Sequence, residues 1–177
     1  QGRVEKLRRA EGVIRALRPP TYDHLMRCFW DFYNPWLQVV DEGGFEAGRS
    51  TQDSRFYSTF LHLAMLAIGF RFADRERDDM QRLMAGARES TFHREAKALA
   101  QMELERPGGI PSVQASVLLA DLECGVGRDA TGWMYAGRFP LNPVVERSEL
   151  TDFRYGVPFG VRHRPACKSW RAGDLGP

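Results

Sequence analysis

The chain has 177 residues, of which 43% are hydrophobic and 11% aromatic, and this composition is typical of one globular domain with one core. Its formal net charge of +2 is too small to indicate nucleic-acid binding by the whole chain, and no apolar run is long enough to predict a membrane span. The three cysteines (Cys28, Cys124 and Cys167) are too few and too far apart for a disulfide framework or a CxxC metal site, which favours a reducing compartment.

Residues 1–18 carry six basic and two acidic side chains, and their apolar residues recur at helical spacing. The apolar positions are Val4, Leu7, Ile14 and Leu17. This spacing predicts an amphipathic helical linker with a solvated basic face, which ends at Pro19 and Pro20. The alternative is the end of a dimerising coiled coil, although such coils usually need three or four heptads and this segment has about two.

The next helix is predicted to be unusually aromatic, with Thr21 as a candidate cap. Aromatic residues at three- and four-residue spacing indicate a buried face rather than a cofactor site. Pro35 should bend or end this helix near Asn34. Residues 42–45 are predicted to form a turn, and residues 46–54 a polar loop.

Residues 54–73 predict a second strong apolar helix, in which Ala64, Ala67 and Gly69 would allow close contact with a neighbouring helix. The charged run 74–79 is predicted as a loop. Residues 80–105 read as helical, with a break at Ser90 and Thr91.

Residues 110–138 are the most buried-looking stretch. Pro111 suits a first helical position, and the helix that follows is apolar nearly all round, which is typical of the middle of a bundle. Gly125 and Gly127 end it, and Asp129 or Thr131 can cap the next helix. That helix is expected to turn three residues toward the core: Trp133, Ala136 and Gly137.

After residue 138 the helical periodicity disappears, and prolines accumulate. Residues 139–177 are therefore predicted to be an irregular or disordered tail, with at most a short strand at 153–157.

No catalytic, cofactor-binding or metal-ligating residue is predicted. The four histidines (His24, His62, His93 and His163) fall in different segments, and none has a partner at the spacing of a metal motif such as HExxH, so each is interpreted as a core or surface residue. Neither a GxSxG nucleophile elbow nor a phosphate-binding P-loop is present.

One acidic cluster gives an alternative. Asp74, Asp78 and Asp79 could hold magnesium for a diphosphate substrate, as in terpene synthases. Arg75 and Arg77 are interleaved with them and no second metal motif is present, so a solvated charged loop is the favoured interpretation.

Three segments, in order, resemble the fungal-specific transcription factor domain, the regulatory middle homology region of fungal zinc-cluster regulators. They are LMRCFWDFYNPWLQVVDEGGFE (25–46), FLHLAMLAIGFRFAD (60–74) and REAKALAQMELERPGGIPSVQASVLLADLECGVGRDATGWMYAGR (94–138). The last is the most specific, because it holds a proline before a Val-Gln-Ala start, a leucine-rich helix, a glycine turn and a Gly-Trp-Met-Tyr-x-Gly entry to the next helix.

The resemblance implies an all-α fold, an irregular bundle of about five to six helices. It also implies that the domain regulates RNA polymerase II transcription in a fungal nucleus without catalysis. It implies residues 1–18 as a linker and 19–138 as an incomplete regulatory domain. DNA would be bound through a Zn2Cys6 cluster, which this chain lacks and a longer parent would carry, so zinc is expected only there. Further expected partners are a second copy of the chain, transcriptional co-regulators or a small-molecule effector, and no membrane.

The resemblance ends where Pro140 interrupts a helix that the family continues. We therefore expect that residues 139–177 do not belong to the native fold. Two other functions stay open at this point. One is an all-helical enzyme of the terpene-synthase type using Asp74, Asp78 and Asp79, and the other is a plain helical protein-interaction module.

Overall fold

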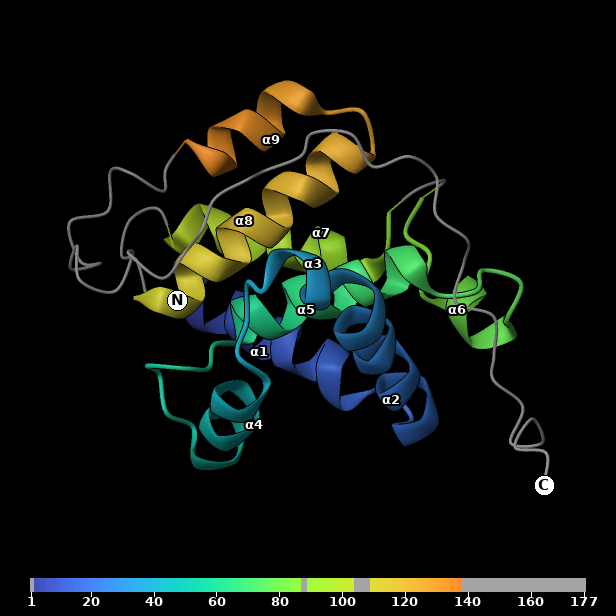
Figure 1. Cartoon of the computed structure of the whole chain (residues 1–177), viewed down its shortest axis with the longest axis horizontal. Coiled ribbons are helices and arrows are strands. Elements are labelled where there is room, and N and C mark those ends of the chain that lie inside the picture. The colour runs from blue at the N-terminus through green and yellow to red at the C-terminus, as the bar shows by residue number, and fades with distance from the viewer. Residues whose placement is uncertain (1, 87–88, 104–108, 138–177) are drawn as a thin grey trace.

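The computed structural model describes residues 2–86, 89–103 and 109–137. These residues form helices and one isolated antiparallel β-bridge, between Met84 and Ser90, so the prediction of an all-α fold is confirmed. Figure 1 shows the helices arranged as an irregular bundle around α5 (Thr59–Phe72).

Helix α5 lies at the centre because nearly every face of it is apolar. All residues from Phe60 to Phe70 are buried, and the helix packs against α2 (Pro19–Cys28), α7 (Thr91–Glu103) and α8 (Ile110–Gly125). Its start is fixed by Ser58, whose Oγ accepts a hydrogen bond from the backbone N–H of Leu61 at 3.1 Å. The prediction placed this start at Ser54 and was wrong. Phe56 lies outside the helix and is 45% exposed.

Helix α2 begins at Pro19, so the prediction that Thr21 caps it was wrong. At its other end a wide π-helical turn, Phe29–Tyr33, precedes the short α3 (Asn34–Leu37), and the bend expected near Asn34 is confirmed. The Asn34 side chain fixes the following loop, because it donates to the carbonyl of Val40 at 2.9 Å and accepts from its N–H at 3.1 Å.

Helices α2 and α5 cross at unusually short range. A Cβ atom at Gly69 would overlap the carbonyl oxygen of Leu25 and lie 2.9 Å from its carbonyl carbon. Only glycine fits at this position without a shift of α2. The expectation that Gly69 allows a close helix contact is therefore confirmed.

The turn at 42–45 and the loop at 46–54 were predicted wrongly, because most of this stretch is helix α4 (Glu42–Thr51). Asp41 caps the helix by accepting the N–H of Gly44 at 2.6 Å, and Phe45 anchors it by burying its ring in the core. The cap and the anchor outweigh the low helix propensity of Gly43 and Gly44.

The predicted break at Ser90 and Thr91 is confirmed. Short helix α6 (Asp78–Arg82) precedes the Met84–Ser90 bridge, and α7 follows, with Ser90 Oγ accepting the N–H of His93 at 3.1 Å. Helix α6 begins inside the stretch 74–79 that was predicted as a loop.

The N-terminal helix α1 (Gly2–Arg15) packs against α7 and α5. Its second half supplies the contact, since Ala10 is buried and Ile14 lies against the core, whereas Val4 is 56% exposed. The predicted amphipathic helix is therefore present, with one end packed on the bundle. Arg9 Nε also donates to the buried Glu95 of α7 at 2.8 Å.

Helix α8 begins with Pro111 in its first turn and ends at Gly125, as predicted, and Gly127 turns the chain into α9 (Asp129–Ala136) with a φ of 83°. Neither Asp129 nor Thr131 caps α9, which begins after Arg128. The prediction that Trp133 faces the core was wrong. Gly132 is the buried residue of α9, and a Cβ there would lie 2.8 Å from the carbonyl oxygen of Ala120.

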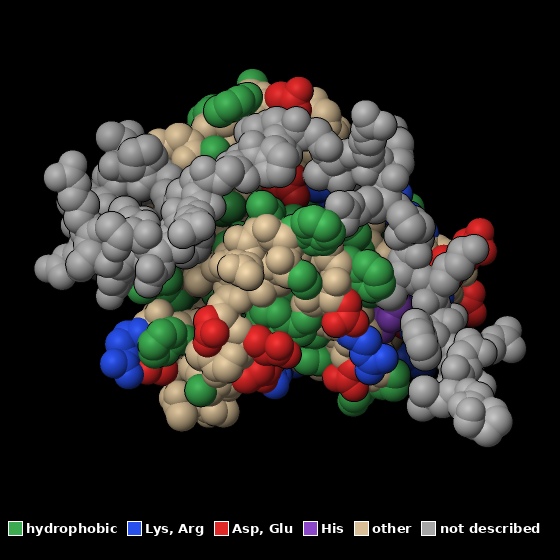
Figure 2. Space-filling view, viewed as in Figure 1, with side chains coloured by type: hydrophobic (Ala, Val, Ile, Leu, Met, Phe, Trp, Pro, Cys, Tyr) green, Lys and Arg blue, Asp and Glu red, His purple; other side chains and the backbone are tan. Residues whose placement is uncertain are grey.

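Because Gly132 holds α9 close to α8, the two residues directly after it point outward, while Tyr135 packs against the core. Trp133 and Met134 are each 60% exposed, and Figure 2 shows apolar side chains on the outer side of α9, at the top of the view. In the described part of the chain, no helix combines the length and apolarity needed to cross a membrane. The predicted tail at 139–177, with its strand at 153–157, lies outside the described residues.

Candidate functional site

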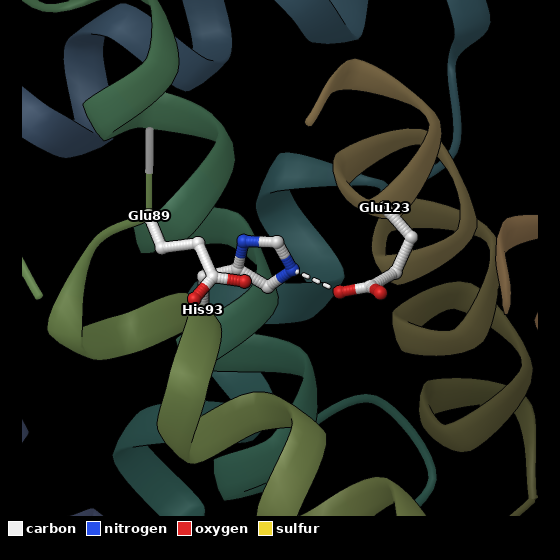
Figure 3. A group of neighbouring side chains, drawn as sticks. All are labelled: Glu89, His93 and Glu123. Atoms are coloured by element: carbon white, nitrogen blue, oxygen red, sulfur yellow. Dashed lines mark hydrogen bonds and ion pairs between the residues drawn. The ribbon is translucent and has the colours of Figure 1, made fainter. Parts of the chain in front are cut away.

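A group of ionisable side chains around the buried Glu123 lies where α7, α8 and the start of α9 meet. His93 of α7 and Glu123 of α8 point toward each other with their side chains 2% and 0% exposed, and Glu89 lies beside them (Figure 3). His93 Nε2 and Glu123 Oε1 are 2.7 Å apart. We call Glu89, His93, Lys97, Glu123 and Arg128 the ionic cluster.

The Glu123 carboxylate of α8 is bonded by side chains from one other helix, α7, and from the turn before α9. Lys97, one turn after His93 on α7, donates to Oε2 at 3.1 Å. Arg128 donates to Oε2 through Nε at 2.7 Å and to Oε1 through Nη2 at 2.9 Å, and its Nη2 also contacts Glu89. The Arg128 backbone N–H donates to the Glu123 carbonyl at 2.9 Å. Glu123 therefore fixes the relative positions of α7, α8 and Arg128, the residue directly before α9.

The protonation states follow from these contacts. Burial opposes ionisation of Glu123, but the hydrogen bonds from Arg128 and Lys97 prevail and hold its pKa at about 2. Burial lowers the pKa of His93, and the hydrogen bond with Glu123 only partly opposes this shift. At neutral pH the imidazole is uncharged, so Nε2 carries its proton toward the carboxylate.

The charges within the ionic cluster cancel. Two carboxylates, Glu89 and Glu123, face one guanidinium and one ammonium, while His93 is neutral. Atoms of Glu89, His93 and Glu123 that could ligate a metal lie within 4.8 Å of one another. Because Arg128 and Lys97 already supply the positive charge that those carboxylates need, the arrangement favours a structural ionic junction over a cation site.

A second buried polar group surrounds His62 in the centre of α5. The hydroxyls of Tyr22 and Tyr57 lie 3.0 Å from its Nε2 and 3.3 Å from its Nδ1, and the Phe45 ring meets it edge-on at 5.3 Å. A neutral imidazole suits this place, because one ring nitrogen donates to a tyrosine and the other accepts. The aromatic face predicted to be buried is buried only in part, since Phe29 and Tyr33 lie in the core whereas Phe32 and Trp36 are 37% and 69% exposed.

The burial of His62 predicts destabilisation by acid. Burial lowers the pKa of His62 to about 3, and Arg49 adds to the shift, so between pH 3 and its ordinary value of 6.5 the unfolded chain binds a proton that the folded chain does not. The unfolding free energy should thus fall as the pH falls, with His62 contributing about 2 kcal/mol of the loss between roughly pH 7.5 and pH 5. Urea unfolding at the two pH values measures it.

His62→Gln is the comparison variant, since its amide can still bond to Tyr22 and Tyr57. Between the two pH values, the unfolding free energy of this variant should fall by about 2 kcal/mol less than that of the wild-type chain. Equal losses would show that His62 is not protected from protonation in the fold.

The acidic residues singled out in the sequence do not converge. Asp79 accepts from Arg77 and from the hydroxyl of Thr21, Asp74 accepts the N–H of Glu76 at 3.0 Å, and Asp78 is exposed. Hydrogen bonding from Arg77 lowers the pKa of Asp79 well below its usual range. Among the described residues, these three carboxylates do not form a group with metal-ligating distances.

The other polar residues noted in the sequence are separate from the ionic cluster. His24 Nε2 lies 3.8 Å from the sulfur of Cys28 within α2, and burial lowers its pKa. Cys124 is half-buried on α8 and forms no disulfide with Cys28, the other cysteine among the described residues. His163 and Cys167 lie outside the described residues.

Comparison with known proteins supports the resemblance seen in the sequence. The family model of the fungal specific transcription factor domain matches residues 26–139, which include α5, α7, α8 and α9. No solved structure matches the chain.

Two curated relatives are similar over most of the chain. The nitrogen assimilation transcription factor nirA of Emericella nidulans is 28% identical over 145 residues, which are 73% of this chain and 15% of the relative. The nitrogen assimilation transcription factor nit-4 of Neurospora crassa is 28% identical over 128 residues, 67% of this chain and 12% of the relative. The chain thus matches only a small part of the length of either relative.

Proposed function

The chain belongs to the fungal specific transcription factor domain family, and on this premise we propose that it is a regulatory part of a zinc-cluster regulator acting on RNA polymerase II in the nucleus. The observation that carries the proposal is the family match over residues 26–139. The two relatives are both named as transcription factors, which supports a role in transcription for this chain.

DNA binding is assigned in this proposal to a Zn2Cys6 cluster outside these 177 residues, and zinc would be bound there. The cysteines within the described residues support this division, because Cys28 is buried in α2 and Cys124 lies on α8, in separate parts of the bundle. The surfaces of this chain would then serve a second copy, co-regulators or a small-molecule effector.

The domain is proposed to act without catalysis. The buried ionisable groups support this role, since Glu123 bonds to His93, Lys97 and Arg128. Groups that saturate one another in this way fix the positions of helices and have little capacity left to bind or protonate a substrate.

A reporter measurement tests the proposal. The chain is fused to a bacterial DNA-binding domain, and transcription by RNA polymerase II is measured in a fungal host from a promoter carrying the matching operator. The fusion should change reporter transcription several-fold relative to the DNA-binding domain alone. Because both relatives are named for nitrogen assimilation, cultures on two nitrogen sources form two arms of the experiment.

Two substitutions serve as controls at matched protein levels. Gly69→Ala, which forces α2 away from α5, should abolish the effect, and Gly12→Ala, at an open position of α1, should preserve it. A folded fusion located in the nucleus that leaves transcription unchanged on both nitrogen sources would contradict the proposal.

A further inference from the structure

We propose that the pocket between the start of α2 and α6 binds a small anion carrying two negative charges on oxygen atoms. The pocket has a volume of about 380 Å³ and is open to solvent. Its charged lining consists of Arg18, Arg77, Asp78, Asp79 and Arg82. This inference goes beyond the proposed function and does not depend on it.

The charge of Asp79 is already compensated within the pocket wall. Arg77 donates to its two oxygens through Nε at 3.0 Å and Nη2 at 2.9 Å, and the buried Thr21 hydroxyl donates to Oδ2 at 2.9 Å. These bonds hold Asp79 against α2 and leave Nη1 of Arg77 without a partner among the described residues. Two of the three aspartates considered as a cation site, Asp78 and Asp79, therefore lie in a wall that also holds three arginines.

Two further guanidinium groups are available to a ligand. The guanidinium groups of Arg18 and Arg82 make no hydrogen bond or ion pair with the described residues, and both residues are exposed. With Arg77 and Asp79 cancelling each other, Arg18 and Arg82 face one exposed carboxylate, that of Asp78. The lining thus keeps one net positive charge before a ligand enters.

Recognition would fall to these side chains and not to the start of α2. Pro19 and Pro20 have no N–H groups, and the N–H groups of Thr21 and Tyr22 both donate to the carbonyl of Arg18 at 3.0 Å. Guanidinium forks bind planar or tetrahedral oxyanions through paired hydrogen bonds. The ligand class is therefore a small phosphate or dicarboxylate, whose charge Arg18 and Arg82 can neutralise together.

The test uses the purified full chain and calorimetric titration with inorganic phosphate and, separately, with malonate. Sodium chloride at the same ionic strength corrects for general screening, because exposed charges respond to salt. At least one dianion should bind saturably with a dissociation constant below about 10 mM. The anion that binds distinguishes a phosphate site from a dicarboxylate site.

Substitutions that remove a positive or a negative charge from the pocket distinguish binding there from binding elsewhere on the surface. Arg18→Gln together with Arg82→Gln should weaken binding at least tenfold, while Asp78→Asn should tighten it severalfold. Arg3→Gln with Arg8→Gln removes the same charge from exposed positions of α1 and should leave the affinity within twofold.

The proposal is overturned if neither dianion binds beyond the chloride control. It is equally overturned if the two double variants lose affinity alike, because the binding would then follow net charge and not the pocket. Circular dichroism of each variant verifies the fold, and the Asp78→Asn result gives a gain that damage to the structure would not produce.

Discussion

Gly69→Ala is expected to lower the unfolding free energy by about 3 kcal/mol, although alanine is the better helix former. The added Cβ would overlap the Leu25 carbonyl, and both helix backbones would have to move apart. A main-chain carbonyl cannot rotate away as a flexible side chain does, so the clash is relieved only by loosening the contact between α2 and α5. Urea unfolding monitored by circular dichroism measures the change.

Gly12→Ala is the matched control, because Gly12 is an exposed residue inside α1 and a Cβ there meets nothing within 4 Å. This variant should gain about 0.5–1 kcal/mol, since alanine loses less backbone entropy in a helix. The two glycine substitutions should therefore change stability in opposite directions. Equal effects would contradict the close crossing at Gly69.

Glu123→Gln should lower the unfolding free energy by about 3 kcal/mol while keeping the size of the side chain. The change removes the negative charge that Lys97 and Arg128 share, and leaves both cations less well paired. As these two side chains are about one-third exposed, water compensates part of the loss, which is why a larger effect is not expected.

An exposed pair provides the comparison. Glu11→Gln removes the partner of Arg15 on the surface of α1 and should change stability by less than about 0.5 kcal/mol. A double variant of Glu123→Gln and Lys97→Gln should lose less than the two single losses added together, because they share one interaction. Strict additivity would show that Lys97 and Glu123 are not coupled in solution.

Much of the fold could be predicted because local patterns and tertiary packing agree in α5 and α8. Both helices are apolar on nearly every side, and only central positions accommodate such helices. The failures occurred where a single contact decides the outcome. Gly43 and Gly44 indicated a turn, but the Asp41 cap and the buried Phe45 make this stretch helical.

The prediction for Trp133 also failed because a single tertiary contact decides the structure. A tryptophan in a short apolar segment is normally assigned to the core, yet the narrow contact at Gly132 sets which face of α9 approaches α8. The neighbours of that glycine, Cys124 and Ala120, come from a different helix. Sequence spacing within α9 does not contain this information.

The ionic cluster was missed for a related reason. Glu123 was not singled out from the apolar helix that carries it, and His93 was interpreted as a core or surface residue. Their side chains meet across thirty positions of sequence. One signal was present, because Glu89 and His93 are four residues apart and Lys97 follows after another four, a spacing that places them on one side of a helical segment.

The central position of α5 has a consequence for how the chain is made. The ribosome completes α5 at Phe72, but α8, which covers one of its apolar sides, is complete only at Gly125. At about 5–20 residues per second, the side of α5 that α8 will cover stays without its partner for roughly 3–10 s. During synthesis the helix that holds the finished bundle together is the segment most in need of protection by a chaperone.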